Sequence, residues 1–296
     1  MNPRSQNELR WWSDSFTRLG LVIVGLFVLM AILQPLLLGS VWPSGVYDPN
    51  TGFDSELLHP SAPTAAHLLG TDPLGRDVVS MIMEGSKPAL LVSTTAAFSS
   101  FVSALAIAGL AVGRRPSRWT AWLASNVALM LPAPIVMAIL GVSVLGDLFT
   151  APVFGLFFGL LTGMSTAGLV LGSRAATVAA SGFMDSAELA GARPSRQFRT
   201  EIVPHLVPLA FVYAALSASA ALITDGFLGF LGLVENRYSW GIIVDFALSF
   251  RNISGTIPWL VLNAASGALS LLALGLFLIA AGVRRWEALK YRESPR

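Results

Sequence analysis

Length, composition and charge exclude several classes of protein. The chain has 296 residues, of which 54% are hydrophobic and only 12% charged, and its formal net charge is +2. Soluble domains carry roughly 25% charged residues, so this chain has too little polar surface to coat a water-soluble globule and we expect it in lipid. The absence of cysteine excludes a disulfide scaffold, a cysteine zinc site and a thiol nucleophile.

Six apolar stretches are long enough to cross a bilayer as helices. A helix of about 20 apolar residues spans roughly 30 Å of hydrocarbon. The six stretches are residues 19–38, 88–112, 119–145, 151–172, 206–233 and 257–283. The sequence therefore predicts an all-α, polytopic membrane protein with six transmembrane helices. Residues 1–296 are expected to form a single transmembrane domain.

Basic residues predict the orientation of these spans. In the six-span arrangement, 15 of the 19 lysine and arginine residues fall on one side of the membrane. Cytoplasmic loops carry an excess of lysine and arginine, so both the N and C termini are predicted to be cytoplasmic. The outer loop 39–87 and the inner loop 173–205 are both too long to be simple connectors, and long loops of this kind often carry function.

A motif in the inner loop reads FMDSAELAGARPSRQFRTEIVPHLVPL and begins at Phe183. An acid precedes helix-forming residues, a glycine breaks the helix, and a basic stretch leads into the fifth span. This order predicts a short helix, a turn and a second helix along the membrane face, with small residues that let a partner surface approach. A basic loop that only follows the positive-inside rule is the alternative. The residues singled out are Asp185, Ser186, Ala187, Gly191, Ile202 and Pro204.

A second motif precedes the second span and reads HLLGTDPLGRDVVS from His67 to Ser80. Its glycines predict tight turns, and Arg76 is flanked by two aspartates. We interpret it as an ion-paired structural element at the outer rim, with direct substrate contact as the alternative. The residues singled out are Gly70, Thr71, Asp72, Gly75, Arg76 and Asp77.

Two features inside the predicted spans are notable. Asp225 is the one charged residue within them, and a charge near mid-bilayer must face protein or water. It is either a polar site that lines a path or a hydrogen-bonded brace between helices. Gly155, Gly159 and Gly163 recur at every fourth residue, a spacing that lets helices pack backbone to backbone, either within the chain or against a partner.

The inner motif resembles the cytoplasmic coupling loop of ABC importer permeases. That loop has an acid followed by two alanines, a glycine four residues after the second alanine, and a later Ile-x-Pro. Here Asp185 stands in place of glutamate and Ser186 in place of the first alanine, while Ala187 and Gly191 are where the resemblance places them, as are Ile202 and Pro204. In the family this loop fits a socket on the ATPase subunit.

The outer motif is similar to the segment before the second span in permeases of the dipeptide, oligopeptide and nickel branch. Four further matches extend the resemblance along the chain to the C-type, or second, permease of a two-permease system. They are Tyr47-Asp48-Pro49, Phe230–Leu233, Ser239-Trp240-Gly241 and Pro258-Trp259.

The resemblance implies a permease of the bacterial or archaeal cytoplasmic membrane, with di- or oligopeptides as substrate and nickel or another small solute as the alternative. It implies four kinds of partner: a second homologous permease, two cytoplasmic ATPase subunits, an extracytoplasmic substrate-binding protein and membrane lipid. The chain itself is expected to bind no cofactor and no nucleic acid, while ATP and Mg²⁺ bind on the ATPase subunits.

The sequence offers little support for an enzyme. It has no phosphate-binding loop of the Walker type, so ATP hydrolysis is expected on separate subunits. The histidines do not predict a metal site, because His59 and His67 are placed outside and His205 inside. An ion-coupled carrier working alone is a further alternative. It would need broken helices with several buried polar groups, and Pro132 and Pro134 could interrupt the third span.

Overall fold

The computed structural model describes residues 14–113, 115–143, 146–181, 194–233, 238–250 and 257–293. It is 80% helical. Among these residues, five helices are long and apolar enough to cross a membrane, and a sixth span results if one bent pair of helices counts as one. The all-α polytopic fold predicted from the sequence is therefore confirmed. The direction in which the termini face stays a prediction.

The first part of the described chain contains two long helices, joined by a long loop. Helix α2 (Ser15–Ser40) is followed by the single turn α3 (Ser44–Tyr47), and α4 covers Val78–Ala111. Helix α4 begins ten residues before the predicted start of the second span at residue 88. Asp77 caps its N-terminus by accepting a hydrogen bond from the backbone N–H of Ser80 (2.7 Å). The last part of the predicted outer loop is therefore helical.

The predicted third span is two helices rather than one. Helices α5 (Arg115–Met130) and α6 (Ala133–Gly141) meet at an angle of 70°. The break falls at Leu131 and Pro132, because the residue before a proline is driven out of the helical region and a proline cannot donate to the preceding turn. A short 3₁₀ turn, η2 (Gly146–Leu148), follows α6.

The fourth span is continuous but contains a π-helical turn. It consists of α7 (Ala151–Thr162), η3 (Gly163–Ala167) and α8 (Gly168–Ala179), with a non-helical Ser165 (φ −74°, ψ −110°) in the middle. The fifth span follows the turn α10 (Pro194–Gln197) and consists of η4 (Phe198–Ile202) and α11 (Val203–Phe230). Helices α12 (Trp240–Ser249) and α13 (Ile257–Glu293) complete the chain.

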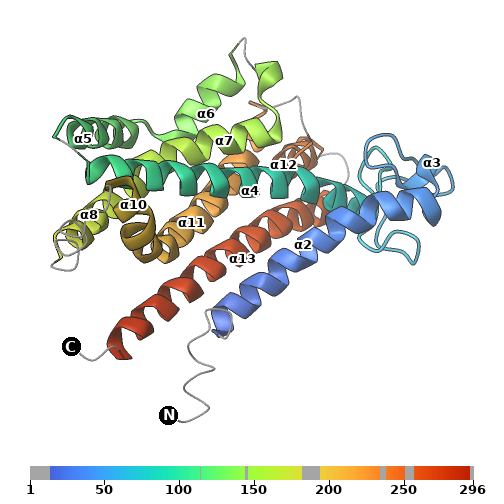
Figure 1. Ribbon diagram of the computed structural model, residues 1–296. Helices are drawn as coiled ribbons and strands as arrows, with labels where there is room; N and C mark the ends of the chain where they lie inside the picture. The colour runs from blue at the N-terminus through green and yellow to red at the C-terminus, as the bar shows by residue number, and fades with distance from the viewer. Residues whose placement is uncertain are drawn as a thin grey trace.

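Helix α4 runs through the middle of the molecule and contacts α2, α7, α8 and α11 (Figure 1). Helix α2 packs antiparallel on α13, since Gly20 lies against Ile279 and Gly282 lies against Thr17. The start of α2 and the end of α13 therefore share one end of the molecule, which we call the inner end. The loop that carries α3 lies at the other end of α2 (Figure 1).

Among the described residues, three of the four clusters of buried apolar side chains include residues of α4, and the fourth joins α11 to α13. The first joins α4 to α2, α12 and α13, the second joins it to α6, α7 and α11, and the third joins it to α8, η4 and α11. The glycines that recur in the fourth span all face α4, where Cβ atoms on Gly155, Gly159 and Gly163 would collide with its backbone or hydroxyl groups. The close packing predicted for these glycines is therefore within the chain.

Candidate functional site

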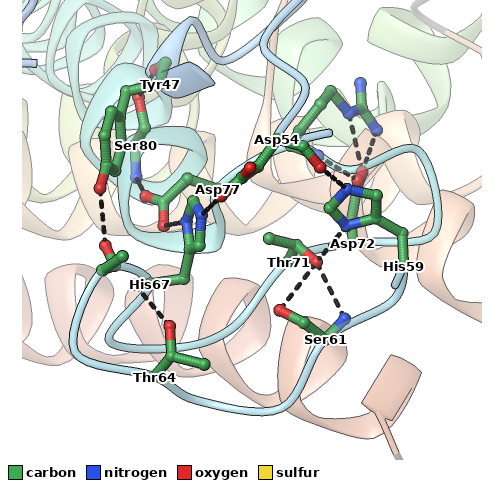
Figure 2. Close-up of polar contacts among 12 residues, drawn as sticks. Tyr47, Asp54, His59, Ser61, Thr64, His67, Thr71, Asp72, Asp77 and Ser80 are labelled. Atoms are coloured by element: carbon green, nitrogen blue, oxygen red, sulfur yellow. Dashed lines mark hydrogen bonds and ion pairs between the residues drawn. The ribbon is translucent and has the colours of Figure 1, made fainter. Parts of the chain in front are cut away.

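Residues 41–77 fold into a compact structure at the end of α2 and the start of α4, opposite the inner end (Figure 1). We call this structure the cap and this end of the molecule the outer end. Apart from the turn α3, the cap has almost no regular secondary structure, and its one β-bridge joins Thr71 to Asp77. Its shape must therefore come from side chains that satisfy the backbone. Figure 2 shows these side chains converging on one another from distant parts of the loop.

His67 lies at the centre of the cap and is completely buried. Its Nδ1 is 2.9 Å from Oδ1 of Asp77, and its Nε2 is 3.3 Å from Oδ2 of Asp54. Each ring nitrogen of His67 therefore has a carboxylate oxygen as its hydrogen-bonding partner. The ring of Tyr47 packs against it with centroids 5.3 Å apart. His67 therefore joins two segments of the cap.

Asp77 connects this cluster to the second span. One of its oxygens faces His67, and the other caps α4 through the backbone N–H of Ser80. The Ser80 hydroxyl donates to the Tyr47 carbonyl (2.6 Å), and the Tyr47 hydroxyl donates to the Ala66 carbonyl (2.9 Å). The N-terminal end of α4 thus binds Tyr47 at the start of the cap, and Tyr47 in turn binds Ala66 in the middle of the cap.

Asp72 and Arg76 form a second cluster within the same motif. The Asp72 carboxylate is fully buried and accepts from the backbone N–H groups of Leu74 (3.0 Å) and Arg76 (2.8 Å). The Arg76 guanidinium donates to it from Nε (2.7 Å) and Nη2 (2.6 Å). Arg76 therefore pairs with one of its flanking aspartates, Asp72, whereas Asp77 pairs with His67.

The glycines and the threonine of the motif set the path of the loop. Gly70 and Gly75 have φ angles of 75° and 84°, which other L residues rarely adopt. A side chain on Gly75 would also collide with Phe53. Thr71 Oγ1 accepts from the Ser61 N–H (2.9 Å) and lies 2.9 Å from His59 Nδ1. All six residues singled out in the outer motif thus belong to the cap or its attachment to α4.

Hydrogen bonds and burial shift the pKa values of titratable groups in the cap, among them Asp54 and Tyr47. A hydrogen bond from the Glu56 backbone N–H, followed by one from the His67 side chain, lowers the pKa of Asp54 below its usual range. Burial, reinforced by the nearby carboxylates of Asp77 and Asp54, raises the pKa of Tyr47. Both shifts favour the protonation states that the hydrogen bonds of the cap require at neutral pH.

The cap rests on α12, where other motifs of the sequence meet. The Arg76 guanidinium lies over the Phe246 ring, 4.8 Å from its centroid. Trp240 Nε1 donates to the Ile82 carbonyl of α4 (3.0 Å), and a Cβ on Gly85 would collide with that indole. Ser239 caps α12, and Gly241 packs against the Gly226 carbonyl of α11. The Ser-Trp-Gly motif therefore joins α12 to the first turns of α4 and to the last turns of α11.

Asp225 lies near this junction rather than near the middle of a span. It is 4% exposed and sits five residues before the end of α11, which is about 8 Å along the helix axis. Its neighbour Gly226 packs under Gly241 of α12. The position is closer to the outer end than the sequence suggested, and both interpretations of Asp225, as a path-lining site or as a brace, stay predictions.

The residues of the inner motif are only partly described. Ile202 is 2% exposed and belongs to the cluster that contains Leu171 of α8 and Leu206 of α11. Pro204 is the second residue of α11 and directly follows the π-helical turn η4. Asp185, Ser186, Ala187 and Gly191 lie outside the described residues.

Curated proteins match this chain over nearly its whole length. It is 30% identical over 294 residues to a putative peptide permease protein of Brucella suis, a match that covers 95% of this chain and 91% of the relative. It is 28% identical over 274 residues to the di/tripeptide transport system permease protein DppC of Pseudomonas aeruginosa, covering 90% and 85% of the two chains. The dipeptide transport system permease protein DppC of Alkalihalophilus pseudofirmus is 27% identical over 285 residues, covering 92% and 88%. No family model matches the chain.

The chain belongs to the peptide transport permeases. This confirms the resemblance to the C-type permeases of the peptide branch and the assignment to the cell membrane as a multi-pass protein. The relatives are permease subunits, which are not themselves enzymes. Among the described residues of the permease, no group of three or more histidine, aspartate or glutamate side chains could hold a metal ion.

Sequence reasoning missed the central residues of the permease cap. His67, His59 and Asp54 were not assigned a role in the outer motif, although His67 is its first residue. A second missed group joins the first two spans, because Lys87 Nζ donates to Glu84 Oε2 (2.6 Å) and to Oε1 of the buried Gln34 (2.7 Å). The Glu84–Lys87 spacing of three residues, typical of a helical ion pair, is the signal that could have revealed it.

Proposed function

We propose that this permease forms the translocation pathway of an ATP-driven importer of di- or oligopeptides together with a second homologous permease. The observation that carries the proposal is the near end-to-end match to relatives whose names specify dipeptide and di/tripeptide transport. Two cytoplasmic ATPase subunits bind ATP and Mg²⁺ and drive the cycle. An extracytoplasmic binding protein delivers the peptide to the outer face.

The coupling segment in this proposal is residues 183–204. Its last residues form η4 and the start of α11, which pack with α8 on α4, and Ile202 is buried among these helices. Phe198 of η4 faces Gly109 of α4, where a Cβ would lie 3.2 Å from its ring. Well-packed elements transmit displacement because protein interiors are dense and hard to compress. Movement of the ATPase subunits against this segment is thereby passed to α4, the central helix.

The cap acts in this proposal as a rigid rim for the binding protein. Its polar groups are used internally, by His67, Asp72 and Asp77, rather than presented to a ligand. This favours bracing over direct substrate contact for the outer motif. A rigid cap fixed to the first turn of α4 also ties a docked binding protein to the same helix that contacts the coupling side.

The test is a bulky substitution in the coupling segment. Gly191→Trp is expected to leave the permease inserted and assembled with its partner permease, while peptide uptake in proteoliposomes falls by an order of magnitude or more. Peptide-stimulated ATP hydrolysis should be lost with it, because the tryptophan blocks the close approach of the ATPase subunit. Gly39→Trp is the control, since a Cβ at Gly39 meets nothing within 4 Å. Normal uptake by Gly191→Trp would show that the segment does not couple.

The same vesicles test the cargo and the energy source. Labelled dipeptide should accumulate only with ATP, the ATPase subunits and the binding protein present. Accumulation of nickel or another small solute in place of peptide would overturn the substrate assignment. Accumulation driven by an ion gradient without ATPase subunits would identify a carrier that works alone.

A further inference from the structure

A groove between α11 and α13 opens at the inner end of the molecule. Its volume is about 410 Å³, within the range of about 300–1,000 Å³ typical of small-molecule sites. The wall is formed by alanines and by Val212, Leu216 and Phe277, together with two arginines, Arg284 and Arg285. Phe277 lies two helical turns before Arg284, about 10 Å along α13. The groove thus has an apolar end and a cationic end.

Two tryptophans of α13 indicate the depth at which the two arginines are expected in a bilayer. Trp259 and Trp286 are 27 positions apart on the continuous helix α13, which corresponds to about 40 Å. A bilayer with its headgroup regions is about 40–45 Å thick, and tryptophans favour both of its interfaces. This spacing fits one tryptophan at each interface, so we expect Arg284 and Arg285, next to Trp286, at the level of the headgroups of one leaflet.

The charges around the groove leave a net positive end. Arg285 is 3.9 Å from the Asp14 carboxylate and stacks on Phe16, with its Cζ 4.9 Å from the ring centroid, yet its side chain is 58% exposed. Arg284 is exposed and makes no ion pair among the described residues. Residues 14–18, at the start of α2, and residues 284–287 of α13 together carry three cations, Arg18, Arg284 and Arg285, and two carboxylates, Asp14 and Glu287.

We propose that this groove is a binding site for an anionic phospholipid. The phosphate and headgroup contact Arg284 and Arg285, and one acyl chain lies along Val212, Leu216 and Phe277. Basic pockets between transmembrane helices favour anionic headgroups through charge, and an apolar groove that continues from the headgroup depth suits an acyl chain. A second permease covering the same face is the competing occupant, and the experiment below separates the two.

The test uses the complete transporter in lipid nanodiscs with a photoactivatable phosphatidylglycerol whose diazirine lies in the acyl chain. Labelling mapped by mass spectrometry should fall on the α11 and α13 peptides around Leu216 and Phe277. An equal amount of photoactivatable phosphatidylcholine should label them at least about tenfold less, because it has no net charge. Excess inorganic phosphate should not compete, since it lacks the acyl chain.

Two matched variants separate the headgroup and acyl-chain contacts. The double variant Arg284→Gln/Arg285→Gln should lower phosphatidylglycerol labelling by about tenfold or more, while Arg115→Gln, at an exposed arginine of α5, should not. Leu216→Trp should lower it by filling the groove with both arginines intact, whereas Leu274→Trp, at an exposed position of α13, should not. Equal labelling by both lipids, labelling unchanged in the double variant, or a groove left unlabelled because the second permease covers it would each overturn the proposal.

Discussion

The cap and the seam between α4 and α7 are held together in opposite ways. In the cap, three buried or half-buried carboxylates, one buried histidine and one arginine bind one another and the backbone of an irregular loop. In the seam, Gly155, Gly159 and Gly163 place one helix directly against the backbone and hydroxyl groups of the other. One region depends on charge and the other on shape.

The difference follows from the environment of each region. A loop without a helical ladder must satisfy its backbone groups with side chains, and charged hydrogen bonds do this most strongly. Within lipid, the hydrophobic effect does not drive helices together, so close packing between small residues takes its place. Substitutions should therefore act on charge in the cap and on volume in the seam.

The largest expected effect is from Asp72→Ala in the cap. The substitution leaves the Arg76 guanidinium half-buried without its partner and removes the acceptor for two backbone N–H groups. Breaking a buried ion pair on one side costs about 3–5 kcal/mol. The melting temperature of the purified permease should fall, and trypsin should gain access to the bond after Arg76.

Asp72→Asn is the matched control, because its amide oxygen can still accept from the two backbone N–H groups. It should lose less stability than Asp72→Ala and stay more resistant to trypsin. Equal behaviour of Asp72→Ala and the parent permease would mean that charge does not hold the cap together.

A smaller effect is expected from Gly159→Ala in the seam. The added methyl group would collide with the Ala96 carbonyl and the Ser99 hydroxyl of α4, and overpacking of this kind costs about 1–3 kcal/mol. Thermal unfolding should shift down without any gain in trypsin cleavage at the cap. Gly267→Ala, at a position with nothing within 4 Å, is the control. A seam that accepted the methyl group without loss of stability would not depend on shape.

The smallest expected effect is the response of the cap to acid. The folded pKa of Asp54 is lowered, so its contribution to stability is present above the unfolded value of about 3.9 and is lost as the pH falls through the lower folded value. The melting temperature of the parent should therefore approach that of Asp54→Asn as the pH falls from 7 to 3. If the difference between the two melting temperatures stayed constant over this range, ionisation of Asp54 would not contribute to the stability of the cap.

Much of the helical framework could be predicted because it depends on local sequence. The apolar stretches at residues 19–38, 151–172 and 257–283 each lie within helical segments of the structure. The start of α4 could not be read from hydropathy, because Glu84 and Lys87 interrupt the apolar pattern. These two side chains fit within the helix because they pair with each other and because Lys87 also donates to Gln34 of α2, which lies far from it in the sequence.

The sequence by itself determined that this protein is a membrane protein and which transport family it belongs to. Both could be read from the sequence because span length, basic flanks and short motifs are local properties of a chain. Only the tertiary structure decided how the outer motif works. The segment was predicted as an ion-paired element around Arg76, and Arg76 does pair with Asp72, but a second polar cluster centres on the buried His67, which contacts both Asp54 and Asp77. In an irregular loop no helical or strand period links such partners, so their pairing follows from the folded path alone.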